Sequence, residues 1–264
     1  MITSIDLDHV AVAVERHVDA WPRYVGDLGG RWLSGGDSIG FAAAQVSYAN
    51  GMKLEALQPA SVDRNDFLRR FLDASGPGVH HLTFKVADIS AALAAAEGAG
   101  IQPVGVDLRD ADWKEAFLHP KAARGVVVQL AQSMGSWSSP PPPDLPEAAR
   151  GPAALAHVTH AVADLDDGLV LFADLLGGER TEEGHGPDGR WVELAWPGPG
   201  RVRLLEPVDE LRRWLGGRPG RVHHLAFELD DPGAVTGARA LGEDSWEVAP
   251  EDNLGVRLRL TATG

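Results

Sequence analysis

The chain has 264 residues, of which 44% are hydrophobic, and its 38 acidic and 24 basic residues give a formal net charge of -14. This length and composition suit one large or two ordinary globular domains, while the negative charge disfavours nucleic acid and anionic membranes as partners. Cysteine is absent, which excludes disulfide bonds, thiolate catalysis and zinc sites built from cysteine.

The N-terminal stretch, MITSIDLDHVAVAV, lacks the basic segment and the long apolar run of a signal peptide. Its alternating end, DHVAVAV, predicts a first β-strand. No run approaches the roughly 18 apolar residues of a membrane span, so we expect no transmembrane segment and a cytoplasmic location.

A strand followed by a helix recurs along the first half. DHVAVAV precedes a helical stretch at about residues 18–28, and VHHLTFKVAD precedes an Ala-rich one at about 89–99, with Gly100 as its C-cap. Further strand-like runs follow each helix, at residues 40–48, 52–57, 116–119 and 125–131. We predict βαβββ as the repeating unit, with one strand of each unit not assigned to particular residues.

A Pro/Ser-rich stretch, SSPPPPDLPEAARGP, separates two similar halves. Consecutive prolines are stiff and extended, and they do not join the interior of a sheet. The sequence predicts a first domain at residues 1–131, a linker at 132–152 and a second domain at 153–264.

The two halves repeat each other, most clearly in GVHHLTFKVADIS and RVHHLAFELDDPG. The number of residues that separates matching positions of the two halves decreases toward the end of the chain. This decrease indicates that the second half has lost residues between Gly242 and Asn253. The prediction is an α+β fold with four tandem βαβββ modules, the last truncated by a shortened or missing strand.

Strand alternation places four polar side chains on one face of the first half. Side chains two apart share a face, which selects His81 rather than His80 and sets it with His9, Glu55 and Gln129. Two imidazoles, a carboxylate and an amide oxygen suit a divalent first-row metal. The alternative is a structural hydrogen-bonded pair of histidine and glutamate.

These stretches resemble the vicinal oxygen chelate superfamily, which includes glyoxalases, bleomycin and fosfomycin resistance proteins and extradiol dioxygenases. DHVAVAV, KLEALQP, GVHHLTFKVADISAAL and FLHPKAARGVVVQLAQ make the first half especially similar to methylmalonyl-CoA epimerases. The resemblance covers nearly all of residues 5–132 and, more weakly, 154–262. It implies two cupped-sheet domains, the second of them degenerate, and one divalent ion of cobalt, nickel, manganese, zinc or iron bound in the first domain.

The resemblance implies His9, Glu55, His81 and Gln129 as metal ligands, and Glu55 and Gln129 as catalytic residues. The family pattern commonly ends in a glutamate at the Gln129 position, where it acts as base or ligand. An amide ligates through oxygen but does not accept a substrate proton. Glu55 therefore remains as the candidate base.

The second half keeps His157 and His224 but places Arg203 at the Glu55 position and Arg259 at the Gln129 position. Arginine stays protonated and does not ligate metals. One interpretation is an anion-binding site made by these four residues. The other is a structural salt-bridge cluster with Glu193 or Glu228.

Three functions follow from these patterns. The first is a metal-dependent enzyme acting on a small oxygen-bearing substrate by epimerase, isomerase or lyase chemistry through an enolate-like intermediate. The second is a protein that binds and sequesters a small molecule without catalysis. The third, disfavoured by the strand position of the carboxylate, is an iron(II) dioxygenase. Each is compatible with a monomer or a homodimer.

Overall fold

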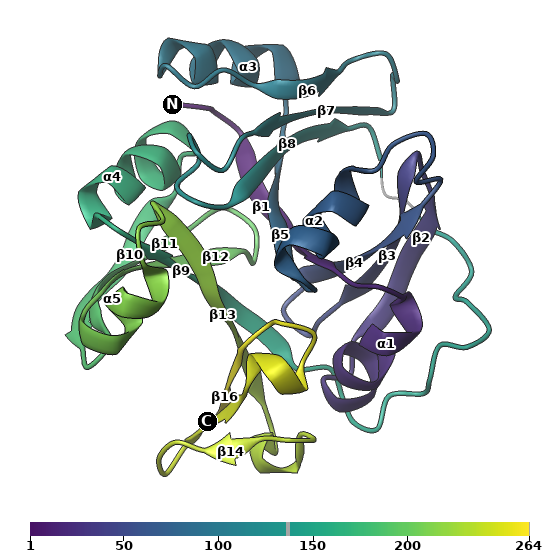
Figure 1. The fold of residues 1–264 in the computed structure, drawn as a ribbon, viewed down its shortest axis with the longest axis vertical. Helices are drawn as coiled ribbons and strands as arrows, with labels where there is room; N and C mark the ends of the chain where they lie inside the picture. Colours follow the sequence, from purple (N-terminus) through teal and green to yellow (C-terminus); the bar gives the residue numbers. More distant parts are fainter. Residues whose placement is uncertain (136–137, 264) are drawn as a thin grey trace. The chain divides into compact units, whose positions relative to one another are not determined.

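The protein, described here by a computed structural model over residues 1–135 and 138–263, contains two eight-stranded sheets (Figure 1). Residues 136 and 137 of the predicted linker and residue 264 lie outside the described part. Sheet A has the strand order β2-β3-β4-β1-β5-β8-β7-β6, and sheet B has the order β10-β11-β12-β9-β13-β16-β15-β14. The two orders are the same after renumbering, which confirms the predicted duplication and the α+β class.

The first half forms sheet A and its helices. Its elements are β1 (Ile5–Ala13), α1 (His17–Trp21), the π-helix η1 (Pro22–Asp27), β2 (Arg31–Asp37), β3 (Gly40–Ser47), β4 (Lys53–Ala60), α2 (Phe67–Ser75), β5 (Gly78–Val86), α3 (Ile89–Gly98), β6 (Val104–Asp107), β7 (Trp113–Leu118) and β8 (Val127–Ser133). Each predicted helix and strand of this half is present. The Asp88 side chain caps α3 at its start, and Gly100 follows its end with a positive φ of 77°, as the C-cap prediction requires.

The second half repeats this sequence of elements in sheet B. They are β9 (Ala154–Val162), α4 (Leu165–Leu169), the π-helix η2 (Val170–Leu175), β10 (Glu179–Gly186), β11 (Gly189–Ala195), β12 (Arg201–Pro207), α5 (Asp209–Leu215), β13 (Gly220–Leu229), the 3₁₀ turn η3 (Pro232–Ala234), β14 (Arg239–Ala240), β15 (Ser245–Val248), the 3₁₀ turn η4 (Pro250–Asp252) and β16 (Leu258–Ala262). The π-helical turn after α1 recurs after α4, so even this local irregularity is repeated.

The fourth module is truncated, as predicted, but the loss lies earlier than predicted. The short turn η3 stands where the other modules have a helix, and β14 has only two residues. The stretch from Gly242 to Asn253 still holds β15, which pairs with β16. The missing residues therefore belong to the helix and the second strand of the module.

Strand register shows which positions are equivalent in the four modules. In each module the first strand runs parallel to the fourth. The facing residues in the four modules are Ala11 and Glu55, Thr83 and Gln129, Thr159 and Arg203, and Ala226 and Arg259. The arginines of the second half thus occupy the strand positions of Glu55 and Gln129.

Contacts between residues divide the chain into two compact units, each drawing on both halves. One unit contains residues 1–8, 81–136 and 157–223, and the other contains residues 9–80, 137–156 and 224–264. Phe84 packs edge-on against Trp196 in the first unit, with ring centroids 5.1 Å apart, and Tyr48 packs on Phe227 at 5.0 Å in the second. The proposed domain boundaries at residues 131 and 153 stay a prediction.

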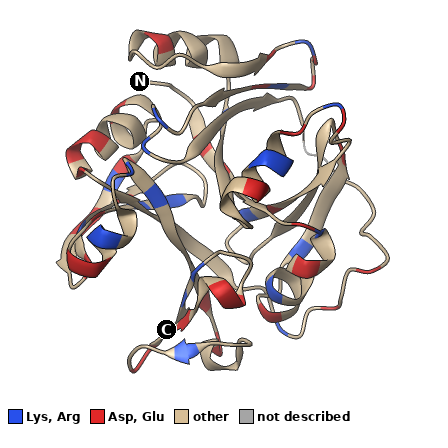
Figure 2. Cartoon of the chain, viewed as in Figure 1, with Lys and Arg blue, Asp and Glu red and all other residues tan. Residues whose placement is uncertain are grey.

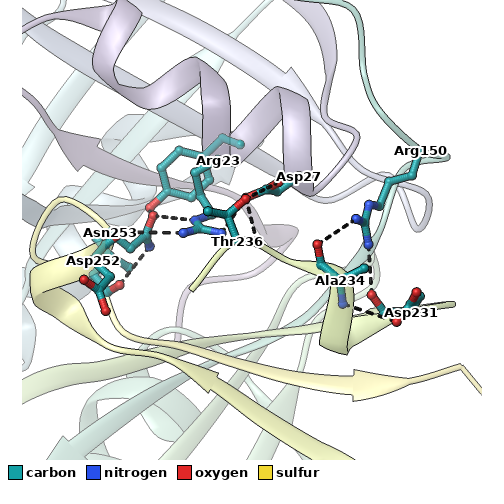
Figure 3. A network of polar contacts seen from close by, with 10 residues as sticks. Arg23, Asp27, Arg150, Asp231, Ala234, Thr236, Asp252 and Asn253 are labelled. Atoms are coloured by element: carbon teal, nitrogen blue, oxygen red, sulfur yellow. Dashed lines mark hydrogen bonds and ion pairs between the residues drawn. The ribbon is translucent and has the colours of Figure 1, made fainter. Parts of the chain in front are cut away.

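A polar network joins η1 to the last module within the second unit (Figure 3). The buried Arg23 guanidinium forms an ion pair with Asp27 at 2.6 Å and donates to the Asn253 side chain at 3.3 Å. The Thr236 hydroxyl donates to Asp27, and the Arg150 side chain donates to the carbonyl of Ala234. Buried charge is retained where such partners compensate its desolvation.

The helices α2 and α5 each carry both basic and acidic side chains (Figure 2). Among residues 1–135 and 138–263, none of the helices has the length and apolar character needed to cross a membrane.

Candidate metal centre

The centre begins with a histidine and a glutamate on neighbouring strands of sheet A. His9 lies on β1 with only 1% of its surface exposed, and Glu55 lies half-buried on the parallel strand β4. The His9 Nε2 atom and a Glu55 carboxylate oxygen are 3.5 Å apart. The register sets Ala11 opposite Glu55, so the side chain two positions before Ala11, on the same face of β1, reaches the carboxylate.

His81 on β5 completes the cluster. One ligand atom from each of His9, Glu55 and His81 lies within 4.8 Å of the other two, and His81 is 5% exposed. The structure therefore brings together the two histidines and the carboxylate expected from the sequence. A nitrogen, nitrogen and oxygen donor set of this size matches what zinc and other first-row metals accept from proteins.

His80, the other histidine of the pair, has a different environment. Its ring packs edge-on against Phe67 and Phe71 of α2, with centroids 5.8 and 4.8 Å apart. Burial lowers the pKa of His80 to about 4, although the nearby Glu55 carboxylate acts in the opposite direction. This aromatic packing fits the structural role expected for the first histidine of the pair.

Gln45 on β3 forms a hydrogen bond with the Glu55 carboxylate oxygen that is not the one near His9. It faces Glu55 directly in the antiparallel pairing of β3 with β4. Its amide Nε2 donates to Glu55 Oε1 at 3.0 Å, while Oε2 is the oxygen near His9. The two carboxylate oxygens thus have separate partners. Gln45 was not identified from the sequence, because a lone glutamine on a predicted strand has no characteristic spacing to other polar residues.

Gln129 on β8 is held by a chain of hydrogen bonds. Its Oε1 accepts from the Thr83 hydroxyl at 2.6 Å, and its Nε2 donates to Glu115 Oε2 at 2.7 Å. The Trp113 indole N–H donates to the same Glu115 oxygen at 2.8 Å. A carboxylate only accepts hydrogen bonds when ionised, so Glu115 fixes which end of the amide is the nitrogen. Glu115 was also missed from the sequence.

In the third module, the strand position of Glu55 is occupied by a cation, Arg203. Arg203 on β12 forms an ion pair with Glu193 of β11 at 2.8 Å and stacks on the Trp191 ring at 4.3 Å. Glu193 is also 3.7 Å from His157. Burial, followed by the repulsion from Arg203, lowers the pKa of His157 to about 3. Glu193 is one of the two acidic partners expected for the salt-bridge interpretation.

The arginine of the fourth module also forms an ion pair with a glutamate of the neighbouring strand. Arg259 on β16 forms an ion pair with Glu247 of β15 at 3.2 Å, and Arg257 pairs with the same carboxylate. His224 is half-buried on β13, and Glu228 is exposed. Both proposed anion-binding arginines therefore already have carboxylate partners, which favours the salt-bridge interpretation over the anion site.

Comparisons with known proteins give a family match in the first half. A profile of the glyoxalase/bleomycin resistance protein/dioxygenase superfamily matches residues 8–117. An uncharacterized protein of Bacillus subtilis (strain 168), YqjC, is 31% identical over 133 residues, which is 49% of this chain and 93% of that protein.

Solved structures are similar to one half or to the whole chain. A hypothetical protein from Bacillus halodurans C-125 (28% identity, TM-score 0.46) covers 52% of this chain and is itself covered completely. Methylmalonyl-CoA epimerase from Mycobacterium tuberculosis (25%, TM-score 0.45) covers 51%, with 93% of its own chain matched. A variant of 4-hydroxymandelate synthase from Streptomyces coelicolor covers 100% of this chain and 95% of its own at 16% identity and a TM-score of 0.64. That last likeness is one of fold, and it extends over both sheets.

Proposed function

Because this chain belongs to the glyoxalase/bleomycin resistance protein/dioxygenase superfamily, we propose that it is a divalent-metal-dependent enzyme acting on a small oxygen-bearing substrate. The observation that carries the proposal is the cluster of His9, Glu55 and His81, whose ligand atoms lie within 4.8 Å of one another. We propose one ion of cobalt, nickel, manganese, zinc or iron, held by these three residues.

The donor chemistry of the cluster fits such an ion. Neutral imidazoles and a carboxylate are the usual ligands of first-row divalent metals, and three protein ligands leave a position for substrate. Both histidines are buried, which excludes bulk water and strengthens electrostatic interactions at the centre. A bound divalent ion would supply Lewis-acid chemistry that polarises adjacent substrate oxygens and stabilises an enolate-like intermediate.

We propose epimerase, isomerase or lyase chemistry for the substrate held there. Gln129 cannot take a proton, so Glu55 is our candidate base. Gln129 is our candidate for a fourth ligand or for a group that orients a substrate oxygen. Its amide carries two N–H groups, and one of them is directed to Glu115. The other can serve a substrate oxygen.

The test is the metal content of protein purified without chelator. We expect about one divalent ion per chain in the native protein, and loss of that ion in the His9→Ala, His81→Ala double variant. The matched control replaces two exposed histidines, His119 and His185, by alanine and should keep the ion. A native protein without metal, or a double variant that retains it, contradicts the proposal.

A second candidate function is favoured by the composition of the cluster. Two histidines and one carboxylate are the ligand set of non-haem iron(II) oxygenases, and His9, His81 and Glu55 provide that set. The test is oxygen consumption by Fe²⁺-loaded protein with a panel of catechols and 2-oxo acids. Substrate-dependent oxygen uptake would favour the dioxygenase. No oxygen uptake, together with isomerisation of a substrate by the Co²⁺- or Zn²⁺-loaded protein, would favour the first proposal.

A further inference from the structure

Gln45 contacts the metal centre through the carboxylate of Glu55. We propose that Gln45 is a positioning residue that fixes the Glu55 carboxylate for metal binding. The proposal rests on the proposed function, because it concerns the same centre. It begins from the directly facing pair that Gln45 and Glu55 form across β3 and β4.

The geometry separates the two oxygens of Glu55. The Gln45 amide donates to Oε1 at 3.0 Å, and the other oxygen, Oε2, lies 3.5 Å from His9 Nε2. A hydrogen bond to an ionised acceptor is stronger than one between neutral groups. The amide therefore restricts rotation of the carboxylate and directs Oε2 toward the position between the histidines. Without it, Glu55 must lose that rotational freedom when the metal binds, which weakens affinity.

The charge of the partner matters as much as its hydrogen bond. Gln45 is neutral, so it orients the carboxylate and leaves the negative charge available to a cation. A cationic residue at the same distance would satisfy the carboxylate itself and compete with the metal. The centre thus needs a donor without charge at position 45.

The third module supplies the comparison within the same chain. Its corresponding facing pair is Glu193 on β11 and Arg203 on β12. The carboxylate is again near the first-strand histidine, at 3.7 Å from His157, but its facing partner is a guanidinium at 2.8 Å. Both copies therefore keep a histidine and a carboxylate together. In the third module, however, the carboxylate stands at the position of Gln45 and the cation at the position of Glu55, so the pair is exchanged between the two strands and the partner of the carboxylate is charged instead of neutral.

The experiment measures Co²⁺ binding by the full chain, without any substrate. Gln45→Met removes the donor and keeps the length of the side chain, and Gln45→Asn keeps an amide that is one methylene too short. The control is Gln58→Met on the same strand as Glu55. Gln58 is also half-buried, but its side chain accepts from the His17 backbone N–H at 2.9 Å. Titrations record the dissociation constant and the visible spectrum of bound Co²⁺.

We expect both Gln45 variants to bind Co²⁺ about 10- to 100-fold more weakly, the usual effect of losing a partner that orients a ligand. Their Co²⁺ absorption bands should also shift, because the carboxylate geometry changes. Gln58→Met should match the native protein in both measurements. Equal affinity and an unchanged spectrum in a folded Gln45 variant would overturn the inference while leaving the metal centre intact. Failure of the native protein to bind Co²⁺ would instead refute the proposed function and this inference together.

Discussion

His160 is expected to make the protein lose stability in mild acid. It is fully buried on β9, its Nε2 lies 2.7 Å from the Arg124 carbonyl oxygen, and its ring contacts Phe172 at 5.7 Å. Burial lowers the pKa of His160 to about 4, and the hydrogen bond to the carbonyl offsets only part of that effect. The neutral ring is therefore part of the folded state.

The size and sign of the effect follow from proton linkage. The pKa of a histidine in the unfolded chain is about 6.5. As the pH falls through that value, His160 binds a proton in the unfolded chain but stays neutral in the folded protein. The stability contributed by the neutral ring is complete above about pH 6.5 and declines until about pH 4, where the folded form also protonates. Between about pH 7 and pH 5 the loss amounts to about 2 kcal/mol.

The assay compares the native protein with His160→Gln by urea denaturation over that pH range. The glutamine amide can donate to the Arg124 carbonyl but has no proton to gain near neutrality. Other groups titrate equally in both proteins, so the difference in unfolding free energy isolates His160. We expect this difference to change by about 2 kcal/mol between about pH 7 and pH 5 in favour of the variant. A difference that stays constant within about 0.5 kcal/mol would refute the reasoning.

Two further predictions concern single contacts, each of which lies within one compact unit. Arg23→Met leaves the half-buried Asp27 without its ion-pair partner, and we expect a loss of about 3 kcal/mol in unfolding free energy by chemical denaturation; a loss below about 1 kcal/mol would show that the pair is dispensable. Gly125 has a φ of 90°, and a Cβ there would meet the Gly220 backbone carbonyl. Gly125→Ala should therefore lower the melting temperature more than Gly76→Ala, where φ is also positive but no atom lies within 4 Å; equal shifts would contradict the close approach.

The repeated parts of the fold were predictable because their signals are periodic and occur more than once. The run DHVAVAV, the Ala-rich helix ending before Gly100, and the duplicated HH phrase all fell on the expected elements. The helix α2 was not predicted, although Phe67, Leu68, Phe71 and Leu72 have the spacing of an apolar helical face. The edge strand β2 was missed because RWLSGGD contains two glycines and reads as a loop.

The candidate centre was predictable only in part. Alternation along a strand identifies residues that share a face, and this was enough to select His81 over His80 and to pair it with His9 and Glu55. It does not reveal which residues of the next strand lie opposite, because register depends on turn geometry and packing along the whole sheet. For that reason Gln45 and Glu115, which hold the expected residues in place, became visible only in the structure.

The most direct test of the metal centre is anomalous X-ray diffraction from crystals of the Co²⁺-loaded protein. We expect one strong anomalous peak within about 2.0–2.2 Å of a nitrogen of His9, a nitrogen of His81 and a carboxylate oxygen of Glu55. A crystal that contains Co²⁺ but shows no peak among these three side chains, or shows it at other residues, would contradict the account.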